Sequence, residues 1–335
     1  MRVLRVLMVS SYPPRRCGIG AYAAAGAERL RSDGHEVTVL SPPDGDGDVR
    51  VPFWGGRPFR AAVRLGRQSG RIIVHFQPAL YYRPRAPLSK VATSLSLWWL
   101  CVRRRQTEVL IHEADPPRRW RPDYLLLAAA FRSAPLLLFH TAAERDRLER
   151  EYGVRVRSRV VDHRDGIVVR SRPTRREARD RLGVPLDEAV FVSAGFIHPD
   201  KGLERAVRAL GPSGRLYVVG SVKDRTTRNL AYLERLREAA ARAERVELVE
   251  GYVDEAELDT WVAAADAVVL PYRRSWSSGA LARAQSLGVP AVVTAVGGLP
   301  EQASASDIVV EDDRGLAEAM AGIVSERRGA RTVLG

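Results

Sequence analysis

The chain has 335 residues, of which 45% are hydrophobic and 28% charged, with a formal net charge of +13 and two cysteines. This length suffices for two domains of ordinary size, and the longest apolar run, around residues 94–102, is too short to span a bilayer. Cys17 and Cys101 show neither a disulfide framework nor metal-ligand spacing. Met1 and Arg2 lead directly into a predicted strand, so no signal peptide is expected. The composition therefore excludes a disulfide-rich or membrane-spanning class and predicts a cytoplasmic protein.

The excess of positive over negative charge is confined to the first half of the chain. Residues 1–165 contain 29 Lys and Arg against 16 Asp and Glu, which leaves 24 of each kind for the rest. This imbalance favours an anionic partner for the first half, either a membrane surface, an anionic acceptor or nucleic acid. The alternative is that arginines merely decorate a solvated face. Nucleic acid is the weakest of the three, because the basic residues are scattered and no recognition module is readable.

The first half alternates apolar runs with helical patterns. Strands are predicted at residues 3–9, 37–40, 71–75, 108–112 and 136–139, with helices at 19–31 and 88–105. Gly18 and Gly20 lie where the first helix begins, after a turn-rich loop. His112 lies at the carboxyl end of a strand, where α/β proteins bind ligands, although a structural histidine is the alternative. His75 has a similar position, and His140 precedes a helix cap and is interpreted as mainly structural.

The predicted helix at residues 88–105 has a membrane-like composition at its end. Trp98 and Trp99 lie close to Arg103, Arg104 and Arg105. Aromatic residues beside a cationic cluster suit a membrane interface. The alternative is a half-buried helix whose C-terminal arginines are favoured by the helix dipole.

After a linker at residues 165–175 the alternation of strands and helices starts again. Strands are predicted at 190–193, 216–220, 246–249, 267–270 and 289–294, and helices at 175–182, 232–243, 255–265 and 280–287. Two such runs joined once predict two doubly wound α/β domains, at residues 1–165 and 166–313. A final helix is predicted at residues 314–335.

Two helix starts in the second half are suited to binding an anion. Ser277 and Ser278 precede Gly279 and the helix at 280–287, and serines are good N-caps. The free N–H groups and the positive end of that helix form an anion site at the carboxyl edge of the sheet. Lys201 and Gly202 begin another helix, shortly after the strand at 190–193 and Gly195.

These segments together resemble the retaining glycosyltransferases of family four, which have the GT-B fold. The resemblance covers nearly the whole chain, and it rests on CGIGAYAAAGAERL from Cys17, on Gly195 with Lys201-Gly202, and on residues 263–301 with Leu270-Pro271, Gly288-Val289-Pro290 and Gly297-Gly298-Leu299-Pro300-Glu301. It implies two Rossmann-like domains facing across a cleft. In GT-B proteins the final helix often packs back on the first domain, so residues 314–335 are expected to do so.

The resemblance also implies a site and a reaction. The implied catalytic residue is His112, which would contact the donor sugar. The implied donor-binding residues are Gly18, Gly20, Gly195, Lys201, Ser277, Ser278 and Gly279, to which Arg283 is added as a candidate cation. The implied reaction transfers a sugar from a nucleotide-diphosphate sugar with retention. Neither a cofactor nor a metal is expected, because helix dipoles and Lys201 can neutralise the leaving diphosphate.

The chain departs from the family pattern at three positions. Phe196 stands where an arginine is common, and Ser275 and Arg283 stand where two glutamates are usual. Arg283 could replace a lost cation and meet the diphosphate. The departures also favour an alternative class, a non-catalytic or partner-dependent binding protein on a glycosyltransferase scaffold. Acceptors bind the N-terminal domain in GT-B enzymes, so the basic half predicts a lipid-linked or anionic acceptor at the inner face of a membrane.

Overall fold

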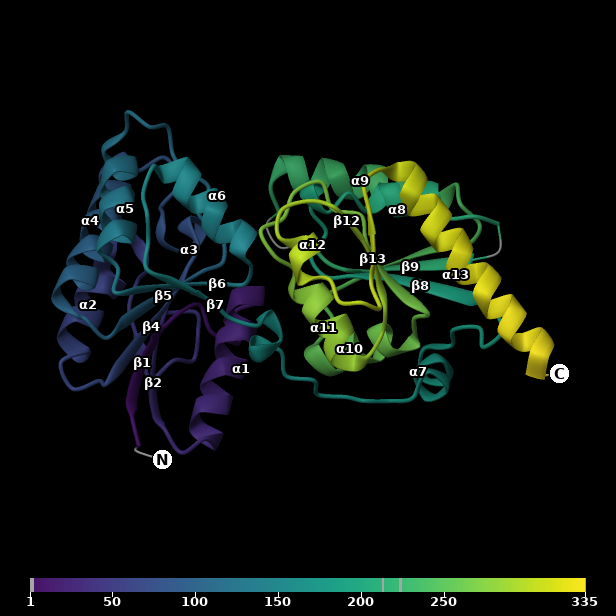
Figure 1. Cartoon of the computed structure of the whole chain (residues 1–335), viewed down its shortest axis with the longest axis horizontal. Helices are drawn as coiled ribbons and strands as arrows, with labels where there is room; N and C mark the ends of the chain where they lie inside the picture. The colour runs from purple at the N-terminus through teal and green to yellow at the C-terminus, as the bar shows by residue number, and fades with distance from the viewer. Residues whose placement is uncertain (1–2, 213, 223–224, 335) are drawn as a thin grey trace. The chain divides into compact units, whose positions relative to one another are not determined.

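A computed structural model describes residues 3–212, 214–222 and 225–334. The chain forms two compact units, Met1–Ile167 and Val168–Gly335, and each is described by itself (Figure 1). The division falls two residues beyond the boundary predicted at residue 165. Within the described ranges, no helix combines the length and apolar composition needed to cross a bilayer.

The first unit is built on a parallel sheet in the order β3-β2-β1-β4-β5-β6-β7. Its strands are β1 (Arg5–Val9), β2 (Glu36–Ser41), β3 (Val49–Arg50), β4 (Arg71–Phe76), β5 (Thr107–Ile111), β6 (Leu136–Phe139) and β7 (Ser158–Val160). Its helices are α1 (Gly18–Ser32), η1 (Trp54–Gly56), α2 (Arg57–Leu65), α3 (Pro78–Tyr81), α4 (Pro87–Arg103), α5 (Pro122–Ser133), α6 (Ala142–Tyr152) and η2 (His163–Gly166). The sequence analysis did not predict α2, α5 or the short strands β3 and β7.

The second unit is built on a parallel sheet in the order β10-β9-β8-β11-β12-β13. Its strands are β8 (Ala189–Ala194), β9 (Gly214–Gly220), β10 (Val246–Glu250), β11 (Ala267–Leu270), β12 (Ala291–Thr294) and β13 (Ile308–Val310). Its helices are α7 (Arg175–Leu182), η3 (Pro199–Lys201), α8 (Leu203–Ala209), α9 (Thr227–Ala241), α10 (Glu255–Ala264), α11 (Gly279–Leu287), α12 (Leu299–Gln302) and α13 (Asp313–Leu334).

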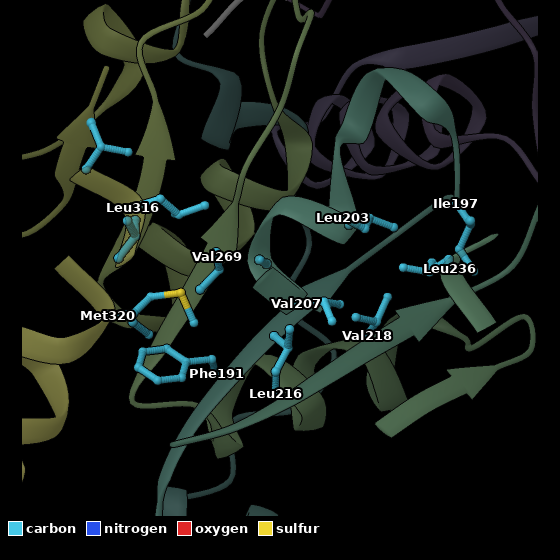
Figure 2. Close-up of a cluster of buried hydrophobic side chains, with 14 of the residues drawn as sticks. Phe191, Ile197, Leu203, Val207, Leu216, Val218, Leu236, Val269, Leu316 and Met320 are labelled. Carbon is cyan, nitrogen blue, oxygen red and sulfur yellow. The ribbon is translucent and has the colours of Figure 1, made fainter. Parts of the chain in front are cut away.

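Both faces of the second sheet are buried, and alternate residues of its strands divide between them. On one face Phe191, Leu216 and Val269 pack against α8, α9 and α13 (Figure 2). On the other face Val192 and Val268 join cores that include residues of α10 and α11. This two-sided burial explains why the central strands are nearly continuous apolar runs.

The C-terminal helix is part of the second unit. Leu316 and Met320 of α13 lie in the core cluster of Figure 2, where they are fully buried beside Phe191. The helix packs against α8, β12 and β13. The sequence predicted a separate element expected to pack back on the first domain. The apolar face of this helix completes one side of the second sheet.

Candidate functional site

The strand order of each sheet reverses at one point, between β1 and β4 in the first unit and between β8 and β11 in the second. Ligands of open α/β sheets bind outside the carboxyl ends of the strands at such points. A ligand site is therefore expected at the loops that follow these four strands. Gly18 and Gly20 follow β1, Gly195 and Lys201 follow β8, and Ser277 to Gly279 follow β11.

In the second unit, Lys201 lies against the loop that follows β11. Its ammonium group sits 3.6 Å from the centroid of the Tyr272 ring, a cation–π contact. The amide of Arg273 donates to the carbonyl of Asp200 at 2.8 Å, which ties the two loops together. The Tyr272 hydroxyl lies 3.4 Å from that of Ser278. A partly exposed cation is thus held at the switch point by residues that also reach the start of α11.

The start of α11 has the geometry of an anion site. The Ser278 hydroxyl accepts from the amide of Leu281 at 3.2 Å, so the predicted N-cap is confirmed. This bond commits the Ser278 side chain to the cap. Within the described ranges, the amides of Gly279 and Ala280 donate no hydrogen bond. These two N–H groups, with the positive end of the helix dipole, are what remains available to an anion.

Gln302 of α12 holds Ser278 in place and was not singled out from the sequence. Its side-chain oxygen accepts from the Ser278 amide at 2.8 Å, and its nitrogen donates to the Ser278 carbonyl at 2.7 Å. The two bonds fix the residue from which α11 begins. Only the tertiary contact between α12 and the loop reveals this, because a glutamine on a short helix carries no distinctive pattern.

Gly195 ends the β8 strand in a conformation that other residues rarely adopt, with φ of +128°. Its amide donates to the carbonyl of Val219 at 2.9 Å. A Cβ on Gly220 would lie 1.7 Å from the Gly195 carbonyl oxygen. The loop toward Lys201 therefore depends on glycine at both positions.

Arg283 takes a different place from the one suggested by the sequence. Its side chain is buried on α11, and its guanidinium pairs with the carboxylates of Glu255 and Asp259 on α10. The other oxygen of Asp259 accepts from the amides of Arg170 and Ser171. Because Arg283 is engaged by two carboxylates, we leave it out of the candidate site.

In the first unit, Gly18 and Gly20 begin α1 beside two buried hydroxyls. A Cβ on Gly20 would lie 3.3 Å from the Ser11 hydroxyl oxygen, so the helix approaches the end of β1 closely. Ser10 and Ser11 are fully buried, and neither hydroxyl has a hydrogen-bond partner within the described residues. Unsatisfied donors at a helix start and a strand end suit a polar ligand.

His112 belongs to a group of four imidazoles at the carboxyl edge of the first sheet. His75, His112, His140 and His163 lie at the ends of β4, β5, β6 and β7. His75 Nδ1 and His112 Nε2 are 3.0 Å apart, within hydrogen-bond distance. The ring of Tyr22 on α1 meets all four edge-on, at centroid distances of 5.3 to 5.8 Å. The sequence analysis noted three of these histidines but neither His163 nor Tyr22.

Gly166 makes room for this arrangement. A Cβ at that position would lie 2.1 Å from the Tyr22 ring. His140 stacks on His163 with ring centroids 3.9 Å apart. Within the described residues, no group of three or more His, Cys, Asp and Glu side chains is arranged to hold a metal ion. The group is a packed set of neutral rings, with His112 at its partly exposed side.

Burial keeps the imidazoles of His75, His112 and His140 neutral. It lowers the pKa of His75 to about 3 and that of His140 to about 4, and it holds the pKa of His112 well below its usual range. Nearby histidines lower the pKa of His75 and His112 further, because they would become like charges. A neutral His112 can donate or accept a hydrogen bond at neutral pH.

We expect the group to make folding stability depend on pH. An unfolded histidine takes up a proton near pH 6.5, whereas folded His140 does so only near pH 4. Between these values the unfolded chain binds more protons, so this contribution is complete above pH 6.5 and is lost as the pH falls. His140→Phe keeps the ring packing and should reduce the pH slope by about 1.4 kcal/mol per unit. Urea unfolding at several pH values measures the slope, and an unchanged slope would contradict the assignment.

A family model described as glycosyl transferases group 1 matches residues 188–326, which span the sheet and the switch point of the second unit. This segment is therefore similar to the group 1 glycosyltransferases. Curated relatives of the chain include two proteins named D-inositol 3-phosphate glycosyltransferase. The one from Xylanimonas cellulosilytica is 36% identical over 124 residues, covering 36% of this chain and 29% of the relative. The one from Streptomyces avermitilis is 33% identical over 198 residues, covering 56% and 42%. The chain thus spans less than half the length of these relatives.

Likeness to solved structures extends over nearly the whole chain. Sucrose-phosphate synthase from Thermosynechococcus elongatus has a TM-score of 0.72 at 18% identity, covering 98% of this chain and 92% of that one. HepE from Anabaena, in complex with UDP and glucose, has a TM-score of 0.72 at 16% identity, covering 97% and 91%. At this identity the likeness concerns the fold alone. It confirms the predicted GT-B fold of two parallel-sheet α/β domains.

Proposed function

We propose that this protein transfers a sugar from a nucleotide-diphosphate sugar to an acceptor, with retention and without a metal. The observation that carries the proposal is that Lys201 and the open amides of Gly279 and Ala280 both lie in the loops at the β8/β11 switch point. A cation beside a helix start stabilises a diphosphate, both when the donor binds and when it leaves. The group 1 family match and the UDP-glucose bound by HepE support this class of donor.

In this proposal the first unit receives the acceptor and supplies His112. Its neutral imidazole, oriented through the 3.0 Å contact with His75, would hydrogen-bond a hydroxyl of the donor sugar. The glycine start of α1 and the Ser10 and Ser11 hydroxyls would meet polar groups of the donor. The excess positive charge of residues 1–165 supports an anionic or lipid-linked acceptor, which the protein would reach at the inner face of a membrane.

Lys201→Ala is expected to weaken nucleotide-diphosphate binding by about 1.5–3 kcal/mol, the value of a charge-assisted contact. Calorimetry with UDP, ADP, GDP and UDP-glucose measures this directly. Arg208→Ala is the matched control, because it removes the same charge from the exposed side of the following helix α8. Equal affinity of wild-type protein and Lys201→Ala would remove Lys201 from the site. Donor binding without any donor hydrolysis or transfer would favour the binding-protein alternative.

A further inference from the structure

Exposed tryptophans and arginines gather at one edge of the first unit. Trp54 lies in η1 after β3, Arg83 lies between α3 and α4, and Leu88 lies in the first turn of α4. Arg118, Arg119 and Trp120 lie between β5 and α5. We call these six residues the carboxyl-edge patch. Because all three connections follow the carboxyl ends of strands of one parallel sheet, they lie at the same edge.

One direct contact and the packing of the neighbouring helices place the three connections near one another. The guanidinium of Arg83 lies 5.9 Å from the centroid of the Trp54 ring. Tyr82, the residue before Arg83, hydrogen-bonds Ser94 of α4 at 2.8 Å and lies within electrostatic reach of Arg121, the residue after Trp120. Helices α4 and α5, which begin at the patch, pack side by side (Figure 1).

The apolar members of the patch are unusually exposed. Leu88 is 83% exposed, Trp120 75% and Trp54 52%. Large apolar side chains that gather at a surface mark an interaction site, whereas isolated ones need no explanation. The arginines of the patch are also exposed, and within the described residues Arg83, Arg118 and Arg119 form no ion pair. The patch therefore offers both unpaired positive charge and insertable apolar groups.

We propose that the carboxyl-edge patch docks the protein on an anionic lipid surface. Tryptophan prefers the headgroup level of a bilayer, leucine can enter the acyl boundary, and arginine pairs with anionic headgroups. Nucleic acid fits less well, because an exposed leucine offers no stacking face to a base. The inference deepens the proposed function, on which it rests for the acceptor: a lipid-borne acceptor would arrive at the same sheet edge as His112.

The carboxyl-edge patch differs from the docking surface predicted from the sequence. The predicted surface was the end of the helix with Trp98, Trp99 and Arg103 to Arg105. Arg104 instead donates two hydrogen bonds to the Val63 carbonyl of α2, and Trp98 is half-buried. The end of α4 precedes β5, so it lies at the amino edge of the sheet. Exposed Arg103 and Arg105 at that edge provide a matched control.

The test is cosedimentation of the full chain with vesicles of phosphatidylglycerol and phosphatidylcholine in equal parts, and of phosphatidylcholine alone. The combined variant Arg83→Ala, Arg118→Ala and Arg119→Ala should weaken binding to the anionic vesicles about 100-fold, since each basic residue near the surface contributes about 1 kcal/mol. The control variant Arg103→Ala and Arg105→Ala should bind within about threefold of wild type, because its arginines lie at the other edge. Wild-type binding should fall as salt is raised.

A second readout reports on insertion. Brominated lipids should quench the fluorescence of the wild-type chain more than that of the variant Trp54→Phe and Trp120→Phe, because these two rings would reach the acyl boundary. Four results would each overturn the proposal. They are equal binding by the wild type and the triple arginine variant, an equal loss of binding in the control variant, equal affinity for both vesicle types, and a preference for single-stranded DNA over vesicles. Calorimetry with UDP on the same samples distinguishes failure of the docking proposal from failure of the proposed function. If the protein binds UDP but not the vesicles, only the docking surface is contradicted.

Discussion

Replacing Arg283 with alanine is expected to destabilise the second unit by about 3–5 kcal/mol, because it leaves a buried carboxylate without its counter-charge. The Asp259 side chain is completely buried, and Arg283 is its only basic partner in the part of the chain that the structure describes. The same Asp259 holds the amides of Arg170 and Ser171, so the segment that enters the second unit should loosen as well. Thermal and urea unfolding measure the loss.

The outcome decides between a structural Arg283 and the donor-binding role considered from the sequence. A stable variant that no longer binds nucleotide diphosphates would return Arg283 to the donor site. Ser275→Ala is the control for the other departure from the family pattern. The Ser275 hydroxyl donates only to the carbonyl of Ser277 in its own loop, at 2.7 Å, so its removal should cost about 1 kcal/mol.

Arg179→Met is expected to destabilise the second unit by at least about 4 kcal/mol, because buried Asp266 loses a counter-charge while one buried and three partly buried carbonyls lose a hydrogen bond. Arg179 is 1% exposed, and its guanidinium pairs with Asp266 at 2.7 Å. The carbonyls that it also binds belong to Ala264, Pro185, Leu186 and Glu188. Methionine can fill much of the volume but can donate to none of them.

Arg175→Met provides a matched control for this change. Arg175 pairs with the same Asp266, also at 2.7 Å, but its side chain is 57% exposed. A pair of this kind contributes about 0–1 kcal/mol. Unfolding measured on both variants should therefore show a large difference for the same substitution on the same acceptor. Equal effects would mean that the buried carbonyl bonds of Arg179 contribute little.

The sequence by itself determined the fold class, because its signals are local. Apolar runs such as residues 267–270 mark strands buried on both faces, and Thr141 with Glu144 marks a helix start that the structure forms as a capping box. Alternation of such runs predicts a doubly wound sheet, whereas the strand order that marks the switch points is given by the structure. The predicted anion site around Gly279 required no more than these signals.

Tertiary structure alone decided which charged and aromatic residues are available to a ligand. Arg283 and Lys201 are both cations near a helix start in the sequence. In the structure Arg283 pairs with Glu255 and Asp259, whereas Lys201 lies on the face of the Tyr272 ring. Tyr22 meets four histidines whose positions in the chain extend from 75 to 163. Such contacts cannot be predicted from periodicity along the chain, because the contacting residues come from strands and helices that are distant in the sequence.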